Sequence, residues 1–302
     1  MSLLNNILRN PAAALRISGA DANTYLQGQF TNDLKGPLGL ARHGLWLDHK
    51  GRVQADSDLL RIGECEWLCF SDSLPGAALA AHLQRSIIAD EVVVVDETAQ
   101  WKGAVLWGDG IEPQLAGSGL SMPTDGRFVA QSDLIAFRAR APRAGAVRLA
   151  WQVDAADRIT TRLRSAGAES TPEDFERERI LHGIPAVPLD IGPRDLPQEG
   201  GLDRTSVSFT KGCFLGQEVM ARLQSRGQVR RRLHVLRGKG TAPAYRSALY
   251  QGGKSVGEIR SSAPDGGGFV AFAMLTLAGL DPARNLSAGA SAPEDISIHH
   301  HG

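Results

Sequence analysis

Cysteine is scarce in this chain of 302 residues, which contains only Cys65, Cys69 and Cys213. Three cysteines are too few, and odd in number, for a disulfide framework, so we expect a reducing compartment. An excess of charge of one sign is also missing, because 33 Lys and Arg residues balance 33 Asp and Glu residues. This balance argues against a dedicated nucleic-acid binder, which usually carries a basic excess, and against a disordered acidic protein.

Long hydrophobic runs are absent as well. The longest apolar stretch, residues 269–280, is shorter than a membrane-spanning helix requires. The first apolar residues of the chain are interrupted by Asn5, Asn6, Arg9 and Asn10, which is unlike a signal peptide. With 42% hydrophobic and 22% charged residues, the composition is that of an ordinary globular protein. We therefore expect a cytoplasmic protein without membrane contact, folded as one large domain or two unequal ones.

Strand-like and helix-like segments alternate along the first part of the chain, which indicates an α+β fold. Residues 44–62 predict a β-hairpin, and residues 92–95 predict a short buried strand. Helical spacing of apolar residues predicts helices over residues 77–88 and 154–167. A further helix is predicted to begin at Thr171, which is followed by proline and two acidic residues.

After Arg232 the chain consists of short strands with glycine turns at regular spacing, which is typical of a small antiparallel β-barrel. We therefore predict an α+β region over residues 1–233, a β-barrel over residues 234–290 and a tail over residues 291–302. The histidines of this tail are either native or left from a purification tag. Residues 248–255 nearly match a phosphate-binding loop, but the alternating residues that follow predict a hairpin turn instead.

Residues 209–218, with the sequence FTKGCFLGQE, contain the strongest candidate for chemistry. A helix predicted to start near Leu215 places Cys213 at its N-terminal end, where unpaired N–H groups and the helix macrodipole favour a thiolate. Lys211 adds a positive charge nearby. Cys213 is then either a reactive thiol or a soft-metal ligand, and the alternative is a buried structural cysteine in a tight turn.

Two other features have simpler explanations. Cys65 and Cys69 flank Trp67 in a predicted strand, and two thiols do not complete a tetrahedral metal site, so we expect core packing. Basic residues then gather after Met220, namely Arg222, Arg226, Arg230, Arg231, Arg232, Arg237 and Lys239. This basic run suits an anionic ligand tail or RNA phosphates, or it is a solvated surface.

Residues 211–218 resemble the KGC(F/Y)xGQE signature of the YgfZ-type folate-binding proteins, which are relatives of the glycine-cleavage T-protein, an aminomethyltransferase. Residues 26–33, LQGQFTND, and the turn at residues 50–52 resemble two further landmarks of that family. The family's approach to the signature, RxxxGIP…D…PxExxxD, is matched in order by Arg179, Gly183-Ile184-Pro185, Asp190, Pro197, Glu199 and Asp203.

This resemblance implies a T-protein-like ring of folate-binding α+β subdomains around a central hole, followed by the small antiparallel β-barrel. It implies tetrahydrofolate or a derivative as the ligand. It also implies a role in the assembly or repair of iron–sulfur enzymes, including those that modify tRNA, with client enzymes or assembly proteins as partners. Glu199 falls where the T-protein relatives have a pterin-holding glutamate, and a carboxylate can accept two N–H bonds from a pterin edge.

The resemblance and the residue types together define the expected site. We expect Cys213 to be the functional thiol or a transient iron–sulfur cluster ligand, with Lys211 as its electrostatic support. We expect Glu199, Gln217 and Arg230 to contact the folate. Gln217 departs from the family pattern, because the T-protein relatives carry an arginine near this position.

Two other functions remain as alternatives. The first is a folate-dependent one-carbon transferase of the aminomethyl type. That chemistry in the T-proteins relies on an aspartate near the start of a helix, and residues 73–89 contain no acid here, so we expect an accessory protein rather than a classical enzyme. The second alternative is a tRNA-binding module that uses the basic run.

Overall fold

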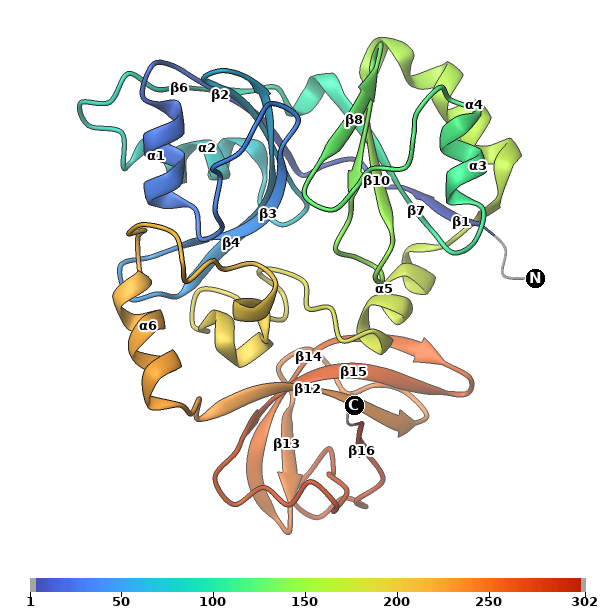
Figure 1. Cartoon of the computed structure of the whole chain (residues 1–302). Coiled ribbons are helices and arrows are strands. Elements are labelled where there is room, and N and C mark those ends of the chain that lie inside the picture. The colour runs from blue at the N-terminus through green and yellow to red at the C-terminus, as the bar shows by residue number, and fades with distance from the viewer. Residues whose placement is uncertain (1–3, 300–302) are drawn as a thin grey trace.

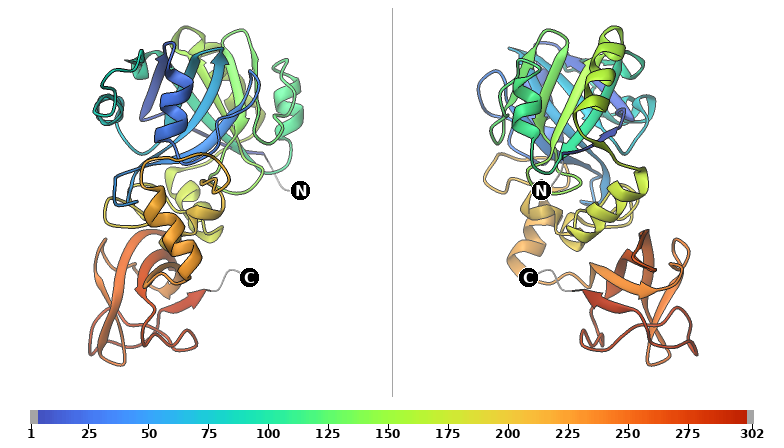
Figure 2. Two further views of the ribbon diagram at one scale, coloured as in Figure 1. Left: turned by 60° about the vertical axis from the view of Figure 1, so that its left-hand side comes forward. Right: turned by 90° about the vertical axis from the view of Figure 1, so that its right-hand side faces the viewer.

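The protein consists of three β-sheets with helices packed on them (Figure 1). The computed structural model describes residues 4–299, apart from the side chains of Ala166 and Arg226. The histidines at positions 300 and 301 therefore lie outside the described residues. Figure 2 shows the first two sheets together at one end of the molecule and the C-terminal sheet at the other. Within residues 4–299, no helix is long and apolar enough to cross a membrane.

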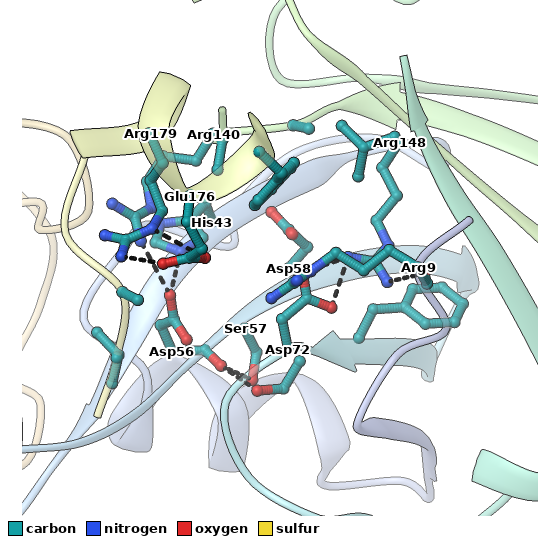
Figure 3. A pocket seen from close by; sticks show the side chains of 18 residues that line it. Arg9, His43, Asp56, Ser57, Asp58, Asp72, Arg140, Arg148, Glu176 and Arg179 are labelled. Carbon is teal, nitrogen blue, oxygen red and sulfur yellow. Dashed lines mark hydrogen bonds and ion pairs between the residues drawn. The ribbon is translucent and has the colours of Figure 1, made fainter. Parts of the chain in front are cut away.

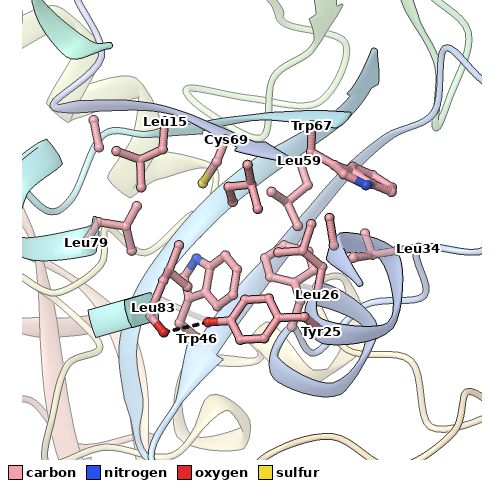
Figure 4. Close-up of a cluster of buried hydrophobic side chains, with 14 of the residues drawn as sticks. Leu15, Tyr25, Leu26, Leu34, Trp46, Leu59, Trp67, Cys69, Leu79 and Leu83 are labelled. Atoms are coloured by element: carbon pink, nitrogen blue, oxygen red, sulfur yellow. Dashed lines mark hydrogen bonds between the residues drawn. The ribbon is translucent and has the colours of Figure 1, made fainter. Parts of the chain in front are cut away.

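The first sheet has the strand order β3-β4-β5-β2-β6 and is antiparallel throughout. Its strands are β2 (Ala13–Ser18), β3 (Ala41–Leu47), β4 (Val53–Gly63), β5 (Glu66–Ser71) and β6 (Val93–Asp96). Helices α1 (Ala22–Gln29) and α2 (Gly76–Gln84) cover one face, over a cluster that includes Trp46, Trp67 and Cys69 (Figure 4). The Tyr25 hydroxyl donates to the carbonyl of Leu83 at 2.6 Å and so joins the two helices.

The second sheet has the order β11-β1-β7-β10-β9-β8, and only β1 and β11 run parallel. Its strands are β1 (Asn5–Leu8), β7 (Trp101–Trp107), β8 (Phe128–Gln131), β9 (Leu134–Arg138), β10 (Val147–Gln152) and β11 (Ala168–Glu169). Helices α3 (Ile111–Ala116) and α4 (Ala156–Ala166) pack on its outer face, and η1 (Thr98–Gln100) and η2 (Val153–Ala155) are short 3₁₀ turns. Its inner face packs against the first sheet, where Phe70 contacts Trp101 and Phe137.

The third sheet has the order β13-β14-β15-β12-β16 and is antiparallel. Its strands are β12 (Arg231–Lys239), β13 (Ala248–Gln251), β14 (Lys254–Asp265), β15 (Gly268–Thr276) and β16 (Ser297–His299). Single bridges at Tyr250–Ser287 and Leu286–Ile296 connect the edge at β13 with the approach to β16, in place of a continuous barrel wall. The predicted boundary near residue 233 lies within β12, and β16 lies within the predicted tail.

Helix α5 (Pro172–Leu181) joins the second and third sheets. Its predicted start is confirmed, because the Thr171 hydroxyl accepts from the Asp174 amide at 3.1 Å in a capping box. Phe175 packs edge-on against Trp107 of β7, whereas Ile180 belongs to the cluster under β12 and β15. The following segment contains η3 (Pro197–Gly200), η4 (Leu202–Arg204) and α6 (Gln217–Arg226).

Most sequence predictions of local structure are confirmed, and three are corrected: α2 ends at Gln84 rather than at residue 88, α6 begins at Gln217 rather than near Leu215, and one strand differs in its burial. The mixed α+β class is confirmed, residues 44–62 form the β3–β4 hairpin, and residues 248–255 form the β13–β14 hairpin rather than a phosphate-binding loop. The strand predicted at residues 92–95 exists as β6, but its predicted burial is wrong. Because β6 pairs only with β2 at the sheet edge, Val93 and Val95 are 56% and 45% exposed.

Candidate functional site

A central cavity of about 90 Å³ lies where β4, the second sheet and α5 meet (Figure 3). This volume holds about six water molecules. Its walls are dominated by charged side chains, with Phe70 and Phe175 among the apolar ones. The charged and titratable lining residues are Arg9, His43, Asp56, Asp58, Asp72, Arg140, Arg148, Glu176 and Arg179.

Two of the three aspartates in this cavity are held by cationic partners. Asp56 accepts from His43 Nε2 at 3.2 Å and from Arg140 Nη2 at 3.3 Å. Burial alone would raise the pKa of Asp56, but the hydrogen bond from His43 and the charges of His43 and Arg140 outweigh it and lower that pKa. Asp72 is bound by Arg148 Nη1, which lies 2.6 Å from each carboxylate oxygen.

Asp58 differs from these two aspartates. Within residues 4–299, no hydrogen bond or ion pair reaches its carboxylate, which faces the cavity between the two ion-paired groups (Figure 3). Burial raises the pKa of Asp58 from 3.8 to about 6, against the opposing charges of His43 and Arg148. A carboxyl group with a pKa near neutrality is suited to donate or accept a proton.

These carboxylates were not predicted from the sequence, because the expected acid belonged to residues 73–89, which contain none. Asp56 and Asp58 come from β4 instead, and Asp72 directly follows β5. Successive side chains of a strand point to opposite faces, so two acids separated by one residue lie on the same face. The sequence Asp56-Ser57-Asp58 in the predicted hairpin was therefore the available signal.

Lys211 of the KGCFLGQE segment anchors the loop on the C-terminal end of α1. Its Nζ donates to the carbonyls of Gln27, Phe30 and Asn32 at 2.7, 2.6 and 3.0 Å. A cation is favourable where the carbonyls at a helix end lack partners. Burial lowers the pKa of Lys211 to about 8, and the charge of Asp33 opposes this shift. The ammonium is thus engaged by the backbone of α1.

The residues after Cys213 also have structural roles. Phe214 is 6% exposed and belongs to the cluster between the β3–β4 hairpin and the third sheet. Gly216 has φ 82° and lies so close to the Asp48 carbonyl and Gly51 that a Cβ would meet them at 2.7 and 2.9 Å. The Gln217 side chain accepts a hydrogen bond from the Phe214 amide at 3.3 Å, and this bond lies within the loop itself.

Cys213 is an exposed thiol, so it is not the buried structural cysteine that the sequence left open. Helix α6 begins at Gln217 rather than near Leu215, which leaves Cys213 four positions before the first helical residue. The macrodipole effect falls off within the first turn, so the helix start does not by itself activate the thiol. Cys213 lines its own cavity of about 460 Å³, together with Trp67, Arg61 and other residues near α1.

Glu199 lies outside the lining of the central cavity, in an ionic network between the η3 segment and the third sheet. Its two carboxylate oxygens accept from Nε and Nη2 of Arg231, each at 3.0 Å, and one also accepts from the Leu196 amide at 2.9 Å. Asp195 joins the network through Arg231 and through Arg260 of β14. The structure therefore does not bring Glu199 to the aspartates of β4.

Some arginines of the basic run form ion pairs, and others are exposed without one. Arg222 pairs with Glu218, and Arg237 pairs with Asp265 at 2.7 Å. Arg230 is exposed, and no ion pair reaches it within the described residues. The side chain of Arg226 lies outside the described part. The run is therefore partly a structural element and partly a solvated surface.

The other two cysteines are placed in and beside the core. Cys69 is fully buried, and burial raises its pKa to about 12, whereas Cys65 is half-buried. Among residues 4–299, no group of three or more His, Cys, Asp and Glu side chains is arranged to hold a metal ion. A metal cluster at Cys213 would therefore need ligands from outside the described residues.

Comparison with known proteins defines the class first. The fold is that of the glycine-cleavage T-protein: the structure matches aminomethyltransferase T from Bartonella henselae with a TM-score of 0.83 at 18% identity, over 99% of this chain and 85% of that chain. No family model matches the sequence.

The curated relatives then define the family. The chain is 30% identical to the mouse protein named iron–sulfur cluster assembly factor IBA57, mitochondrial, over 87% of this chain and 75% of that protein. It is 30% identical to the human protein of the same name over 86% and 74% of the two chains. It is also 30% identical to the tRNA-modifying protein YgfZ of Edwardsiella ictaluri, over 74% and 68%. The chain belongs to this YgfZ and IBA57 family, as the KGCFLGQE signature indicated.

Proposed function

We propose that this protein is a folate-binding accessory protein for the assembly or repair of iron–sulfur enzymes, including those that modify tRNA. The observation that carries the proposal is the exposed thiol of Cys213 on a loop that Lys211 fixes to α1. The names of the relatives, iron–sulfur cluster assembly factor and tRNA-modifying protein, support the same role. The predicted cytoplasmic location stays a prediction, since the mammalian relatives are named as mitochondrial.

Cys213 would bind the iron–sulfur cluster that is passed to a client. A thiolate is a suitable ligand for iron–sulfur clusters, but a complete site has four ligands. The remaining ligands would come from a partner protein or a small thiol. Lys211 acts in this proposal by holding the loop in place, so that Cys213 faces the partner.

The central cavity supports the folate half of the proposal. Among its carboxylates, Asp58 is the one free to accept N–H bonds from a pterin edge. Arg9 and Arg140 line the cavity but are ion-paired with Asp72 and Asp56, so the anionic glutamate tail would have to compete with these pairs for their charge. Bound tetrahydrofolate would supply a carrier for one-carbon units. The folate contacts implied for Glu199, Gln217 and Arg230 remain predictions, and Glu199 competes with its own ion pair to Arg231.

The thiol role is tested by Cys213→Ser, with Cys65→Ser as the matched control. Activity of client iron–sulfur enzymes is measured under oxidative stress in cells that carry only the variant. Cys213→Ser is expected to reduce client activity to that of cells without the protein, while Cys65→Ser has no effect. Full client activity with Cys213→Ser would refute the thiol role.

Calorimetry with tetrahydrofolate tests the ligand. Asp58→Asn is expected to weaken binding about tenfold, because an amide cannot accept two N–H bonds with both of its atoms. Glu199→Gln should weaken binding only if the pterin lies beside Glu199. The folate half of the proposal fails if the wild-type protein does not bind.

A one-carbon transferase is a second candidate, because Asp58 provides a carboxyl group with a pKa of about 6 in the central cavity. Incubation with methylene- or formyl-tetrahydrofolate and candidate acceptors distinguishes this enzyme from an accessory protein. Turnover that is lost in Asp58→Asn and kept in Cys213→Ser would favour the transferase.

A further inference from the structure

A separate cavity of about 530 Å³ lies between the end of α6 and the third sheet, and we call it the α6–β12 cavity. Its walls come from η3 and η4, from the end of α6 with the loop after it, and from β12 and β15. Figure 1 shows how α6 leads directly into β12 at this place. The cavity shares no lining residue with the central cavity or with the Cys213 cavity.

Alternation along β12 brings positive charge to this cavity. Arg231 points to Asp195 and Glu199, with which it forms ion pairs. Its neighbour Arg232 lies on the opposite face of the strand and lines the cavity. Two neighbouring arginines of the basic run therefore differ in role. Arg231 forms ion pairs within the protein, and Arg232 faces the cavity.

Two arginines of the cavity have no acidic partner. Arg204 of η4 and Arg232 of β12 are exposed, and no ion pair reaches either one within residues 4–299. Asp203 is the one carboxylate that lines the cavity among the described residues. Two planar guanidinium groups in one polar cavity are suited to bind an anion, and above all a phosphate.

We propose that the α6–β12 cavity binds a nucleotide through its phosphate, which pairs with Arg204 and Arg232. The volume lies in the range of small-molecule sites and admits a nucleotide. The nucleotide is either free in solution or part of an RNA strand. This site is independent of the iron–sulfur role, because none of its residues takes part in that proposal.

Titration of the full-length protein with three probes tests the site: adenosine monophosphate, inorganic phosphate and a labelled short single-stranded RNA. Arg204→Gln and Arg232→Gln are each expected to weaken nucleotide binding about tenfold, since each removes a charge-assisted contact to phosphate. Arg222→Gln is the matched control, because Arg222 belongs to the same basic run but pairs with Glu218 outside the cavity.

The results distinguish a free nucleotide from a nucleotide that is part of RNA. Tighter binding of RNA, with a salt dependence whose slope falls by about 0.7 for each arginine replaced, assigns the site to RNA. Binding of adenosine monophosphate alone assigns it to a free nucleotide. The proposal is overturned if no probe binds, if pentaglutamate titrated in parallel binds better than all three probes, or if Arg222→Gln weakens binding as much as the two cavity variants.

Discussion

Replacement of Asp58 by asparagine is expected to stabilise the protein at neutral pH, although it removes a residue of the central cavity. Burial raises the pKa of Asp58 from 3.8 to about 6, so the ionised form is costly in the folded state. A difference of this size corresponds to about 3 kcal/mol. Asp58→Asn removes the charge and keeps the shape, so we expect a gain of about 2 to 3 kcal/mol at pH 7.5.

The gain must depend on pH in one direction. Between pH 3.8 and about 6 the folded protein keeps the proton of Asp58, while the unfolded chain has released it. The folded state therefore binds more protons in this window, and the contribution of Asp58 to stability is lost as the pH rises through it. At pH 4 the wild-type residue is neutral in the folded state, and Asp58→Asn should change the free energy of unfolding little.

Asp56, two residues away on the same strand, should respond in the opposite direction. Its lowered pKa reflects His43 and Arg140, so its ionised form stabilises the fold at neutral pH and loses this effect as the pH falls. Asp56→Asn leaves Arg140 without its charged partner, and we expect a loss of about 3 kcal/mol at pH 7.5.

Urea unfolding followed by tryptophan fluorescence at pH 4 and pH 7.5 measures all three effects. Asp125→Asn is the control for loss of a carboxylate as such, because the Asp125 side chain is 98% exposed. The reasoning is refuted if Asp58→Asn fails to stabilise at pH 7.5, or if its gain is equal at both pH values. It is also refuted if Asp56→Asn stabilises.

The same unfolding assay checks three further predictions. Lys211→Met should cost about 3 kcal/mol, because three carbonyls at the end of α1 lose their donor; a loss below about 1 kcal/mol would contradict the anchoring role. Arg231→Gln should cost about 3 kcal/mol and Arg230→Gln less than about 0.5 kcal/mol, and equal losses would show that the ionic network is misassigned. Gly216→Ala should cost about 2 kcal/mol, since its φ of 82° and close backbone neighbours leave no room for a Cβ; an unchanged midpoint would contradict this packing.

Local signals in the sequence predicted the elements that depend on neighbouring residues. The hairpin at residues 44–62 and the capping box at Thr171 were both predictable, because turn glycines and helix caps act within a few residues. The burial of residues 92–95 was not predictable. Four consecutive valines indicate a strand, but only the order of strands in the sheet decides that β6 is an edge.

The roles of the KGCFLGQE residues were harder to predict. Lys211 binds carbonyls that lie 179 to 184 positions away in the sequence, so no local pattern reveals them. The charge of Lys211 was expected beside Cys213 because the two residues are close in sequence. The folded chain satisfies the ammonium on α1 instead, and Cys213 is left as the exposed member of the segment.

The zero net charge of the chain does not describe its individual sites, because the fold pairs some charged groups and leaves others without a partner. Most buried charged groups here are paired, as Arg179 is with Asp190 at 2.6 Å. Such ion pairs have a structural role and need no ligand to account for them. Asp58, Arg204 and Arg232 lack ion-pair partners within residues 4–299, and all three border cavities. An unpaired charged group that faces a cavity can interact with a ligand, whereas it does not stabilise the fold. The increase in the free energy of unfolding expected for Asp58→Asn measures how much stability the protein loses by keeping this group. A chain of zero net charge can therefore offer an acceptor for N–H groups at one cavity and positive charge for an anion at another, because each site is defined by the local lack of a partner.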